Sequence, residues 1–292
     1  GRVDAWNGMT VIGSKVCMAG VGGHSDWAGN EGYSCDLMDA APAWQMLGTP
    51  TANASIQTNV THYLDGRPTA SHTYYGLYGD VARNKIFRIG VGSAWGDGNF
   101  QARNVDAFSL TSNDWDAALT WPSVPENLIY GKAQAQHPET GDIYVCGNTR
   151  LWRFNLHTGT WTQLALIPND GSATYYRASV VDPLRNRLVV LGNAYATPAG
   201  ILIYDLATDT WSTGTLTGSE ASNAAAQSGQ GGHYNAQTDK YLVFHGGESV
   251  IEIDPDTLVA TALATTGGGS MPVTVNGVFQ KCVFVPDLMG YA

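Results

Sequence analysis

The side chains of this 292-residue chain that could do acid-base chemistry are histidines, tyrosines and a few cations near predicted strand ends. A histidine or tyrosine can remove a proton, and an arginine or lysine can neutralise a carboxylate. Elimination from a uronic-acid polymer would need both, with His72 or Tyr74 as the base and Arg177 or Lys132 as the cation. No Gly-x-Ser-x-Gly elbow and no phosphate-binding glycine loop occurs in the sequence. We therefore expect these four residues to be catalytic only if the protein is an enzyme.

A second group of side chains could bind sugars without reacting with them. Aromatic rings in Gly-rich loops stack on the apolar faces of sugar rings, while acids, amides and cations bond the hydroxyls. We expect the ligand-binding residues to be His24, Asp26, Trp27, Trp95, Tyr195 and His233. The alternative is structural: the rings would fold back over the edges of the sheets. His24 would hydrogen-bond a neighbouring sheet, His72 would bridge the first two sheets through backbone carbonyls, and Arg177 would be a structural ion-pair partner.

Metal and cysteine chemistry have little support. The acidic turn Asp254-Pro-Asp256 lacks the spacing of an EF-hand, and no Cys-x-x-Cys pair occurs, so we predict no metal and no cofactor. Cys17 and Cys35 could face each other across a hairpin as a disulfide, or could be small buried apolar residues.

Composition narrows the classes of protein that the chain could be. It has 35 Gly and 9 Trp, and 14% of its residues are charged, against about 25% in average domains. This balance favours many short strands joined by tight turns. The net charge is −10 without a basic stripe, so we expect no nucleic-acid partner. No apolar run is long enough to span a bilayer, and Gly1 suggests a processed or truncated start.

The elements that must position these side chains are marked by a repeated spacing. An aromatic residue, a polar turn and a Trp seven positions on recur in 108–115, 154–161 and 204–211, with a looser copy from Asp36 to Trp44. Each copy follows two apolar stretches joined by a turn such as Asp182-Pro-Leu-Arg-Asn-Arg-Leu188, the second of which ends in Gly. One unit is therefore four antiparallel strands, A to D, with the Trp in strand D.

Such units cannot bury their faces alone, so we predict a single all-β β-propeller domain over residues 1–292. The expected blades span about 4–50, 67–122, 128–168, 173–217 and 230–265, and an incomplete sixth spans 275–292. Seven blades are an alternative. The stretch 220–231 is expected to be a loop with at most one helical turn.

This topology sorts the candidate residues by face. In a propeller the entries to strand A and the B–C loops share one face, and the A–B and C–D turns share the other. The candidates all belong to the first face, whereas His137 and His157 fall in turns of the opposite face. We expect the first face to form a concave mouth that holds the ligand.

The repeated features resemble the kelch motif: Gly-Gly after strand B (Gly22-Gly23, Gly246-Gly247), an aromatic in strand C and Trp in strand D. The resemblance covers nearly the whole chain and implies a propeller, but kelch propellers include enzymes, sugar binders and protein-binding platforms. Segments 22–31 and 66–76 also resemble the galactose-oxidase-like proteins of bacteria and phages.

Galactose oxidase is itself similar in 95–98 and 104–108, but the resemblance implies a copper site that this chain does not match. That site needs two histidines and two tyrosines, one of them cross-linked to a cysteine. No Tyr-His dipeptide occurs here, and Cys35 and Cys146 fall in predicted strands. The resemblance therefore supports the fold and argues against copper oxidase chemistry.

The leading functional prediction is a carbohydrate-binding, adhesive propeller that holds a glycan or polysaccharide at the mouth. Its expected location is extracellular, on a cell surface or on a virion. One alternative is a polysaccharide lyase or another glycan-active enzyme that uses the same mouth. The other is a structural or receptor-binding appendage of a phage virion, with other subunits of that assembly as partners.

Overall fold

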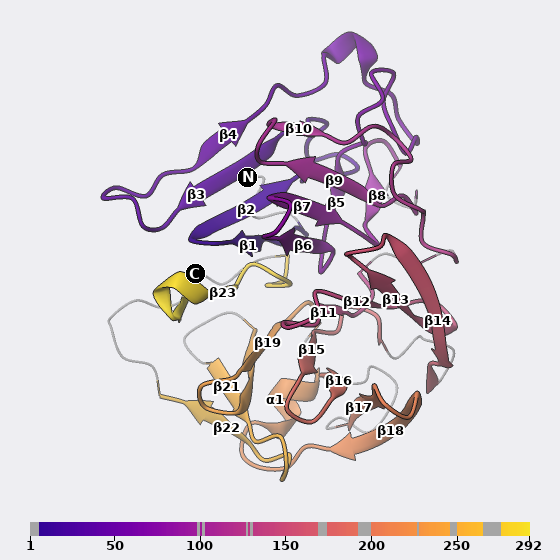
Figure 1. Ribbon diagram of the computed structural model, residues 1–292. Helices are drawn as coiled ribbons and strands as arrows, with labels where there is room; N and C mark the ends of the chain where they lie inside the picture. Colours follow the sequence, from indigo (N-terminus) through magenta and orange to yellow (C-terminus); the bar gives the residue numbers. More distant parts are fainter. Residues whose placement is uncertain are drawn as a thin grey trace. The chain divides into compact units, whose positions relative to one another are not determined.

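The computed structural model describes residues 6–97, 100, 103–126, 128, 131–168, 174–191, 200–226, 228–245, 250–264 and 276–292. Within these residues the chain forms five four-stranded antiparallel sheets, two two-stranded sheets and very little helix (Figure 1). The sheets are the blades of a β-propeller, which confirms the predicted all-β class.

Blades one and two come first in the chain. Blade one comprises β1 (Thr10–Ile12), β2 (Lys15–Ala19), β3 (Gly32–Asp36) and β4 (Gln45–Leu47). Blade two comprises β6 (Leu77–Asp80), β7 (Lys85–Arg88), β9 (Asp106–Ser109) and β10 (Asp114–Trp115). A separate pair, β5 (Ser71–His72) and β8 (Gly92–Ala94), lies in the loops of blade two.

Blades three to five follow the same strand order. Blade three comprises β11 (Gln134–Gln136), β12 (Ile143–Cys146), β13 (Arg150–Asn155) and β14 (Thr160–Leu166). Blade four comprises β15 (Ser179–Asp182), β16 (Arg187–Val190), β17 (Gly200–Asp205) and β18 (Thr210–Thr215). Blade five comprises β19 (Gly231–Asn235), β20 (Lys240–Phe244), β21 (Val250–Ile253) and β22 (Ala260–Leu263).

The predicted count of about six blades is corrected to five. The described part of the expected sixth blade contains only the pair β23 (Phe284–Val285) and β24 (Gly290–Tyr291), joined by a single 3-10 turn at Pro286–Leu288. A stretch this short provides no third or fourth strand. Helix α1 (Ala221–Ala226) is the helical turn expected in 220–231.

The chain divides into two compact units. The first unit is residues 1–131 together with 280–292, and the second is 132–279. The first holds blades one and two with β5, β8, β23 and β24, and the second holds blades three to five with α1. The boundary follows blade two, where the sequence predicts the change from one blade to the next.

Local side-chain chemistry fixes the turns. In blade four Asp182 accepts a hydrogen bond from the backbone N–H of Arg185 (3.0 Å), and Asp80 does the same for Arg83 in blade two (3.1 Å). Asn84 and Asn186 follow with φ of 54° and 50°, the left-handed region that Asn tolerates best after Gly. The predicted A–B turns are therefore present with the expected chemistry.

The strand-D tryptophans mostly pack as predicted. Trp161 lies 4.9 Å from the Phe154 ring centroid, and Trp211 and Trp115 pair with Tyr204 and Phe108 at 5.1 and 5.3 Å. The expectation that Trp44 is a buried strand-D residue is wrong, because Trp44 precedes β4 and is 44% exposed. The turn before it is two residues longer than in the other copies and contains Pro42, and the ring lies outside the paired residues.

The four cysteines are free thiols. The register of β2 and β3 pairs Val16 with Cys35 and Cys17 with Ser34, so the two cysteines of the suggested disulfide are not cross-strand partners. Burial raises the pKa of the Cys17 and Cys146 thiols to about 12. These two therefore behave as small buried apolar residues, which was the other sequence-based interpretation.

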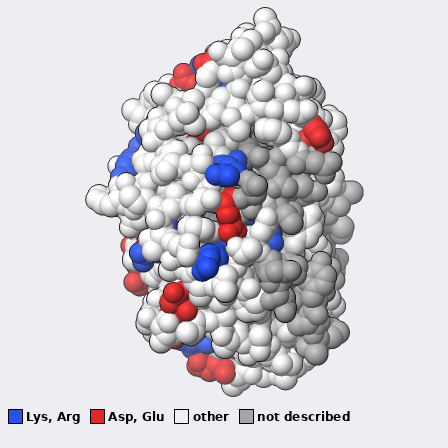
Figure 2. All heavy atoms as spheres, turned by 90° about the vertical axis from the view of Figure 1, so that its right-hand side faces the viewer, with Lys and Arg blue, Asp and Glu red and all other residues white. Residues whose placement is uncertain are grey.

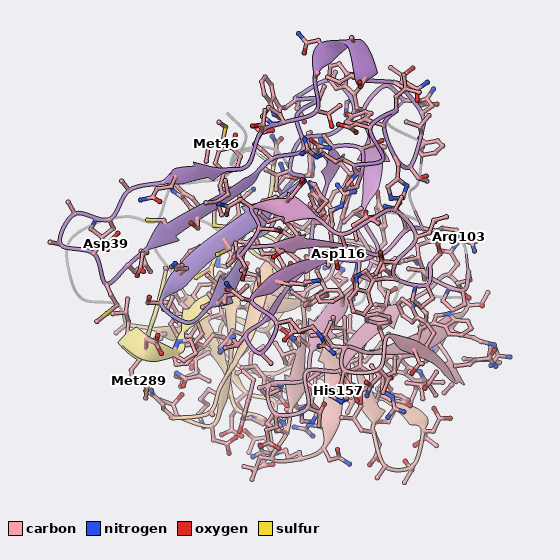
Figure 3. The ribbon with its side chains drawn as sticks, turned by 45° about the horizontal axis from the view of Figure 1, so that its top comes forward. Asp39, Met46, Arg103, Asp116, His157 and Met289 are labelled. Atoms are coloured by element: carbon pink, nitrogen blue, oxygen red, sulfur yellow. The ribbon has the colours of Figure 1, made fainter. Side chains whose placement is uncertain are left out.

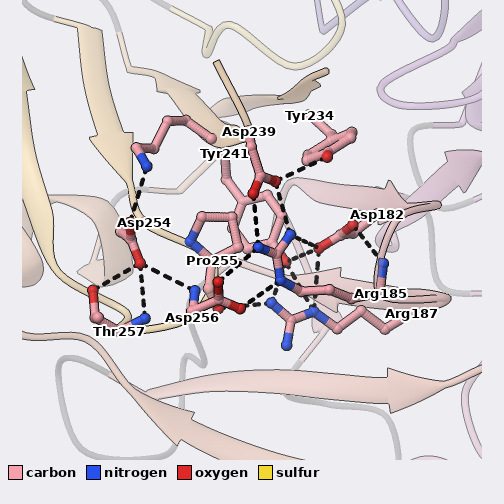
Figure 4. A network of polar contacts seen from close by, with 11 residues as sticks. Asp182, Arg185, Arg187, Tyr234, Asp239, Tyr241, Asp254, Pro255, Asp256 and Thr257 are labelled. Atoms are coloured by element: carbon pink, nitrogen blue, oxygen red, sulfur yellow. Dashed lines mark hydrogen bonds and ion pairs between the residues drawn. The ribbon is translucent and has the colours of Figure 1, made fainter. Parts of the chain in front are cut away.

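Blades four and five are held together by a network of ion pairs within the second unit (Figure 4). The Arg185 guanidinium contacts Asp239 (2.8 Å), Asp256 (2.6 Å) and Asp182 (3.3 Å). Arg187 and Asp182 both hydrogen-bond the Tyr241 hydroxyl, at 2.7 Å in each case. The A–B turn of blade four is therefore tied to both turns of blade five.

The charges on the face shown in Figure 2 are of mixed sign, and most of that face is uncharged. His157, in the C–D turn of blade three, is exposed, as expected for a residue of the turn face (Figure 3). No helix in the described ranges is long and apolar enough to cross a membrane.

Candidate ligand-binding site

The B–C loop of blade one is a tight, internally bonded turn between β2 and β3. The N–H of Gly23 donates to the carbonyl of Trp27 (3.2 Å), and that of Asp26 donates to the carbonyl of Gly23 (3.0 Å). Gly23 has a φ of 118°, and a Cβ on it would lie 2.4 Å from the His72 ring. Only glycine fits here, and its lack of a side chain lets His72 lie directly against the loop.

This loop is joined to the B–C loop of blade two by backbone hydrogen bonds. The N–H of His24 donates to the carbonyl of Ser93 (3.0 Å), and that of Gly96 donates to the carbonyl of His24 (3.1 Å). Trp95 in turn donates from its N–H to the carbonyl of Ala70 (3.0 Å). The structure therefore brings the sequence-predicted residues His24, Asp26, Trp27 and Trp95 into one loop cluster of the first unit.

A chain of hydrogen-bonded polar groups runs from the exposed Asp26 to the buried His72, Tyr74 and Ser93. Asp26 and His72 are joined by Oδ2 and Nε2 at 2.6 Å, His72 Nδ1 is 3.3 Å from the Tyr74 hydroxyl, and that hydroxyl is 3.2 Å from Ser93 Oγ. The rings of Trp6 and His24 lie 5.0 and 5.1 Å from the His72 ring. The two predicted catalytic residues of this unit, His72 and Tyr74, are thus neighbours in one network.

Burial sets the charge state of His72. Its side chain is 2% exposed, and desolvation lowers its pKa, while the hydrogen bond that it donates to Asp26 partly opposes that shift. A neutral ring with its proton on Nε2 donates to Asp26 and leaves Nδ1 to accept from Tyr74. Both ring nitrogens are then engaged inside the protein, which favours a supporting role for His72 over direct attack on a polymer.

The rim above this network is what a ligand can reach. The Asp26 side chain is 38% exposed and Trp27 is 36% exposed. The indole N–H of Trp27 donates to Glu31 Oε1 (3.2 Å), which also receives a short hydrogen bond from the Tyr33 hydroxyl. The Trp27 ring is therefore held in one orientation with part of its surface open, beside a carboxylate.

One backbone position near the site is strained. In four blades one residue at the entry to strand A has a positive φ. It lies six residues before Asp80, His137, Asp182 and Asn235. Blades three and five place glycine there, Gly131 (70°) and Gly229 (71°), whereas blades two and four place Tyr74 (46°) and Tyr176 (52°). A non-glycine residue in this conformation costs about 1–2 kcal/mol. In blade two the strained residue is the one that binds His72.

The remaining predicted site residues belong to the second unit. Lys132 is 1% exposed, and Arg177 is 6% exposed and donates to the carbonyl of Ala225 (2.8 Å). His233 lies within β19, where burial lowers its pKa to about 4. Tyr195 lies outside the described residues. Lys132 and Arg177 are therefore buried within the second unit.

Sequence reasoning missed Trp6 and Ser93, both of which contact the site network. It also missed Arg88, which is fully buried and donates to Asp106 (2.9 Å) and to the carbonyls of Thr69 (2.7 Å) and Gly20 (3.2 Å). A charged residue at the end of the apolar strand 85–88 was the available signal for Arg88. No local signal marked Trp6 or Ser93.

The described residues also line an open depression of about 440 Å³ at the edge of blade two. Its charged lining is internally paired: Arg67 contacts Asp114 (2.9 Å), and Asp116 contacts Lys85 (2.7 Å). None of its lining residues is a predicted site residue. Among the described residues there is no cluster of metal-ligating side chains.

Comparison with known proteins bears on the fold. No protein-family model matches the chain, and no curated protein matches it in sequence. The solved structure of YjhT is similar, with 13% identity and a TM-score of 0.54 over 82% of this chain and 72% of that one. At this identity the likeness supports the propeller fold alone, and the kelch type stays a prediction.

Proposed function

We propose that the chain is a carbohydrate-binding propeller of the kelch type, with a glycan held by the joined B–C loops of blades one and two. The observation that supports it is the rim: a half-open Trp27 ring fixed by Glu31, beside the exposed Asp26 carboxylate. A fixed ring offers an apolar face to a sugar at little entropic cost, and the carboxylate accepts from hydroxyls.

The buried chain below the rim supports binding more than catalysis. Asp26 is held by His72, and His72 by Tyr74, so the loop is preorganised for a ligand. The adhesive role, the extracellular or surface location and the glycan partner are parts of the same proposal.

Glycan-array screening followed by calorimetric titration tests the proposal. Trp27→Ala should weaken binding of the best soluble oligosaccharide about tenfold, since loss of ring stacking and its buried area costs about 1.4 kcal/mol or more. Asp26→Asn should weaken it further. Trp44→Ala is the matched control, because Trp44 is a comparably exposed Trp on the C–D turn of the same blade.

Binding that survives both Trp27→Ala and Asp26→Asn unchanged would refute this site. A wild-type protein that binds no glycan would refute the function itself.

A polysaccharide lyase is the second candidate, because His72 and Tyr74 are hydrogen-bonded to each other and lie behind Asp26. A lyase would release an unsaturated product that absorbs in the ultraviolet. Product release that is abolished by His72→Ala, in a protein that stays folded, would favour catalysis over binding.

A further inference from the structure

The strand-A entries of the second unit are hydrogen-bonded to one another in series. The N–H of Ala133 donates to the carbonyl of Thr174 (2.9 Å), that of Gly229 to Tyr176 (2.9 Å), and that of Phe279 to Gly229 (2.8 Å). The entries of blades three, four and five and the segment that follows blade five therefore lie side by side. Side chains carried by these entries share one surface of the second unit.

Two tyrosines of the blade-four entry are stacked. The Tyr175 and Tyr176 ring centroids are 4.0 Å apart with planes tilted by 32°, and both residues are half-buried. Consecutive side chains of an extended strand point to opposite faces. The positive φ of Tyr176 breaks this alternation and allows both rings to lie on one side.

The cost of this arrangement indicates that the rings have a use. Blades three and five make the same backbone bend with Gly131 and Gly229, for which the conformation is free of strain. Blade four makes it with a tyrosine, at a cost that glycine would avoid. Tyr176 also contacts Phe279 edge-on at 5.6 Å, so the pair rests on a buried ring below it.

We infer that Tyr175 and Tyr176 form a second sugar-stacking site, in the second unit, that takes the apolar face of a pyranose ring. This inference rests on the proposed function only in that both sites would bind a carbohydrate. The residues and the unit differ from those of the loop cluster. Because the two tyrosine rings face each other, the sugar would stack on the outer face of the pair, with Phe279 packed edge-on against Tyr176 as further support.

Calorimetric titration with a short oligosaccharide that the wild type binds tests the inference through stoichiometry. The wild type should bind two molecules per chain. Tyr176→Gly should bind one, and the backbone strain that glycine relieves should offset part of the packing lost against Tyr175 and Phe279. Tyr175→Ala should also bind one, Trp27→Ala should bind one, and the Trp27→Ala, Tyr175→Ala double variant should bind none.

Two titration results overturn the inference. If Tyr175→Ala and Tyr176→Gly both keep the wild-type stoichiometry while Trp27→Ala loses a site, the second site does not exist and the proposed function stands. If the wild type binds no sugar, both the second site and the proposed function are refuted. Should Tyr176→Gly prove unstable, Tyr175→Ala decides alone, because that substitution leaves the strained position untouched.

Discussion

Replacing Arg185 by alanine should destabilise the second unit by more than neutralising either of its two partly exposed partners, Asp239 or Asp256. Its guanidinium is only 17% exposed and serves three carboxylates from three different turns. Without it, the A–B turn of blade four loses its ion pairs to both turns of blade five (Figure 4).

The size of the effect follows from the exposure of each partner. Asp239 is 39% exposed, so its paired contact with Arg185 is screened by solvent and contributes about 0.5–1 kcal/mol. Asp182 is fully buried and would keep Arg187 and the Tyr241 hydroxyl but lose one cation, at a cost of about 1–2 kcal/mol. The 72% exposed Asp256 is expected to add nothing measurable. The total of about 1.5–3 kcal/mol lowers the melting temperature by about 3–12 °C for a unit of this size.

Acid should remove part of the difference in stability between the wild type and Arg185→Ala. The hydrogen bond from Arg185 lowers the pKa of Asp239 from its ordinary 3.8 to about 2. A carboxylate with a depressed folded-state pKa stabilises the fold above its unfolded pKa and loses that contribution as pH falls through the folded one. The difference in melting temperature between wild type and Arg185→Ala should therefore become smaller as pH falls from 4 to 2.

Thermal unfolding followed by circular dichroism, at pH 7 and at several values below 4, measures both effects. Asp256→Asn is the control and should melt like the wild type. The reasoning is refuted if Arg185→Ala melts no lower than Asp256→Asn, or if its deficit is the same at pH 2.5 as at pH 7.

Three further outcomes are expected. The pKa of His233 is about 4 in the folded state against 6.5 in the unfolded state, so the unfolded state binds more protons between these pH values. The free energy of unfolding should therefore fall by up to about 3 kcal/mol as pH drops from 7 to 4. The variant His233→Gln should flatten that pH dependence in urea titrations. The variant Tyr74→Phe should lower the free energy of unfolding by about 1–2 kcal/mol, because it removes the hydroxyl that donates to the buried Nδ1 of His72. An unchanged urea midpoint would contradict this hydrogen bond. Cys17 and Cys146 should react with a thiol reagent only after denaturation, and a total of fewer than four reactive thiols in unfolded, unreduced protein would contradict the free-thiol assignment.

The parts of the fold that local chemistry determines could be predicted from the sequence. The aromatic-to-Trp spacing located the C–D turns, because an Asx turn such as that of Asp205, which accepts from the N–H groups of Ala207 and Thr208, is specified within a few residues. Trp44 shows the limit of this reasoning: the turn before it has two added residues, and its ring lies outside the strand.

The candidate site depended on contacts between distant residues, and these were only partly predictable. Blade topology placed His24, Asp26 and His72 on one face, but nothing in the sequence indicated that Asp26 would bond a histidine 46 residues away. The pair β5 and β8, which sets Ser93 under Tyr74, has two and three residues, too few for a pattern to mark. The left-handed conformation of Tyr74 was equally hidden, since tyrosine is a residue that normally argues against it.

The assignment of residues 280–292 to the first unit has a consequence for synthesis on the ribosome. Gln280 accepts from the N–H of Met9 through its carbonyl (3.0 Å) and from the N–H of Leu77 through its side chain (3.1 Å). The first unit therefore cannot acquire all its contacts until residue 280 has emerged, whereas the second unit is continuous in sequence from 132 to 279. Vectorial synthesis thus favours completion of the second unit before the first, because the first unit also needs residues 280–292.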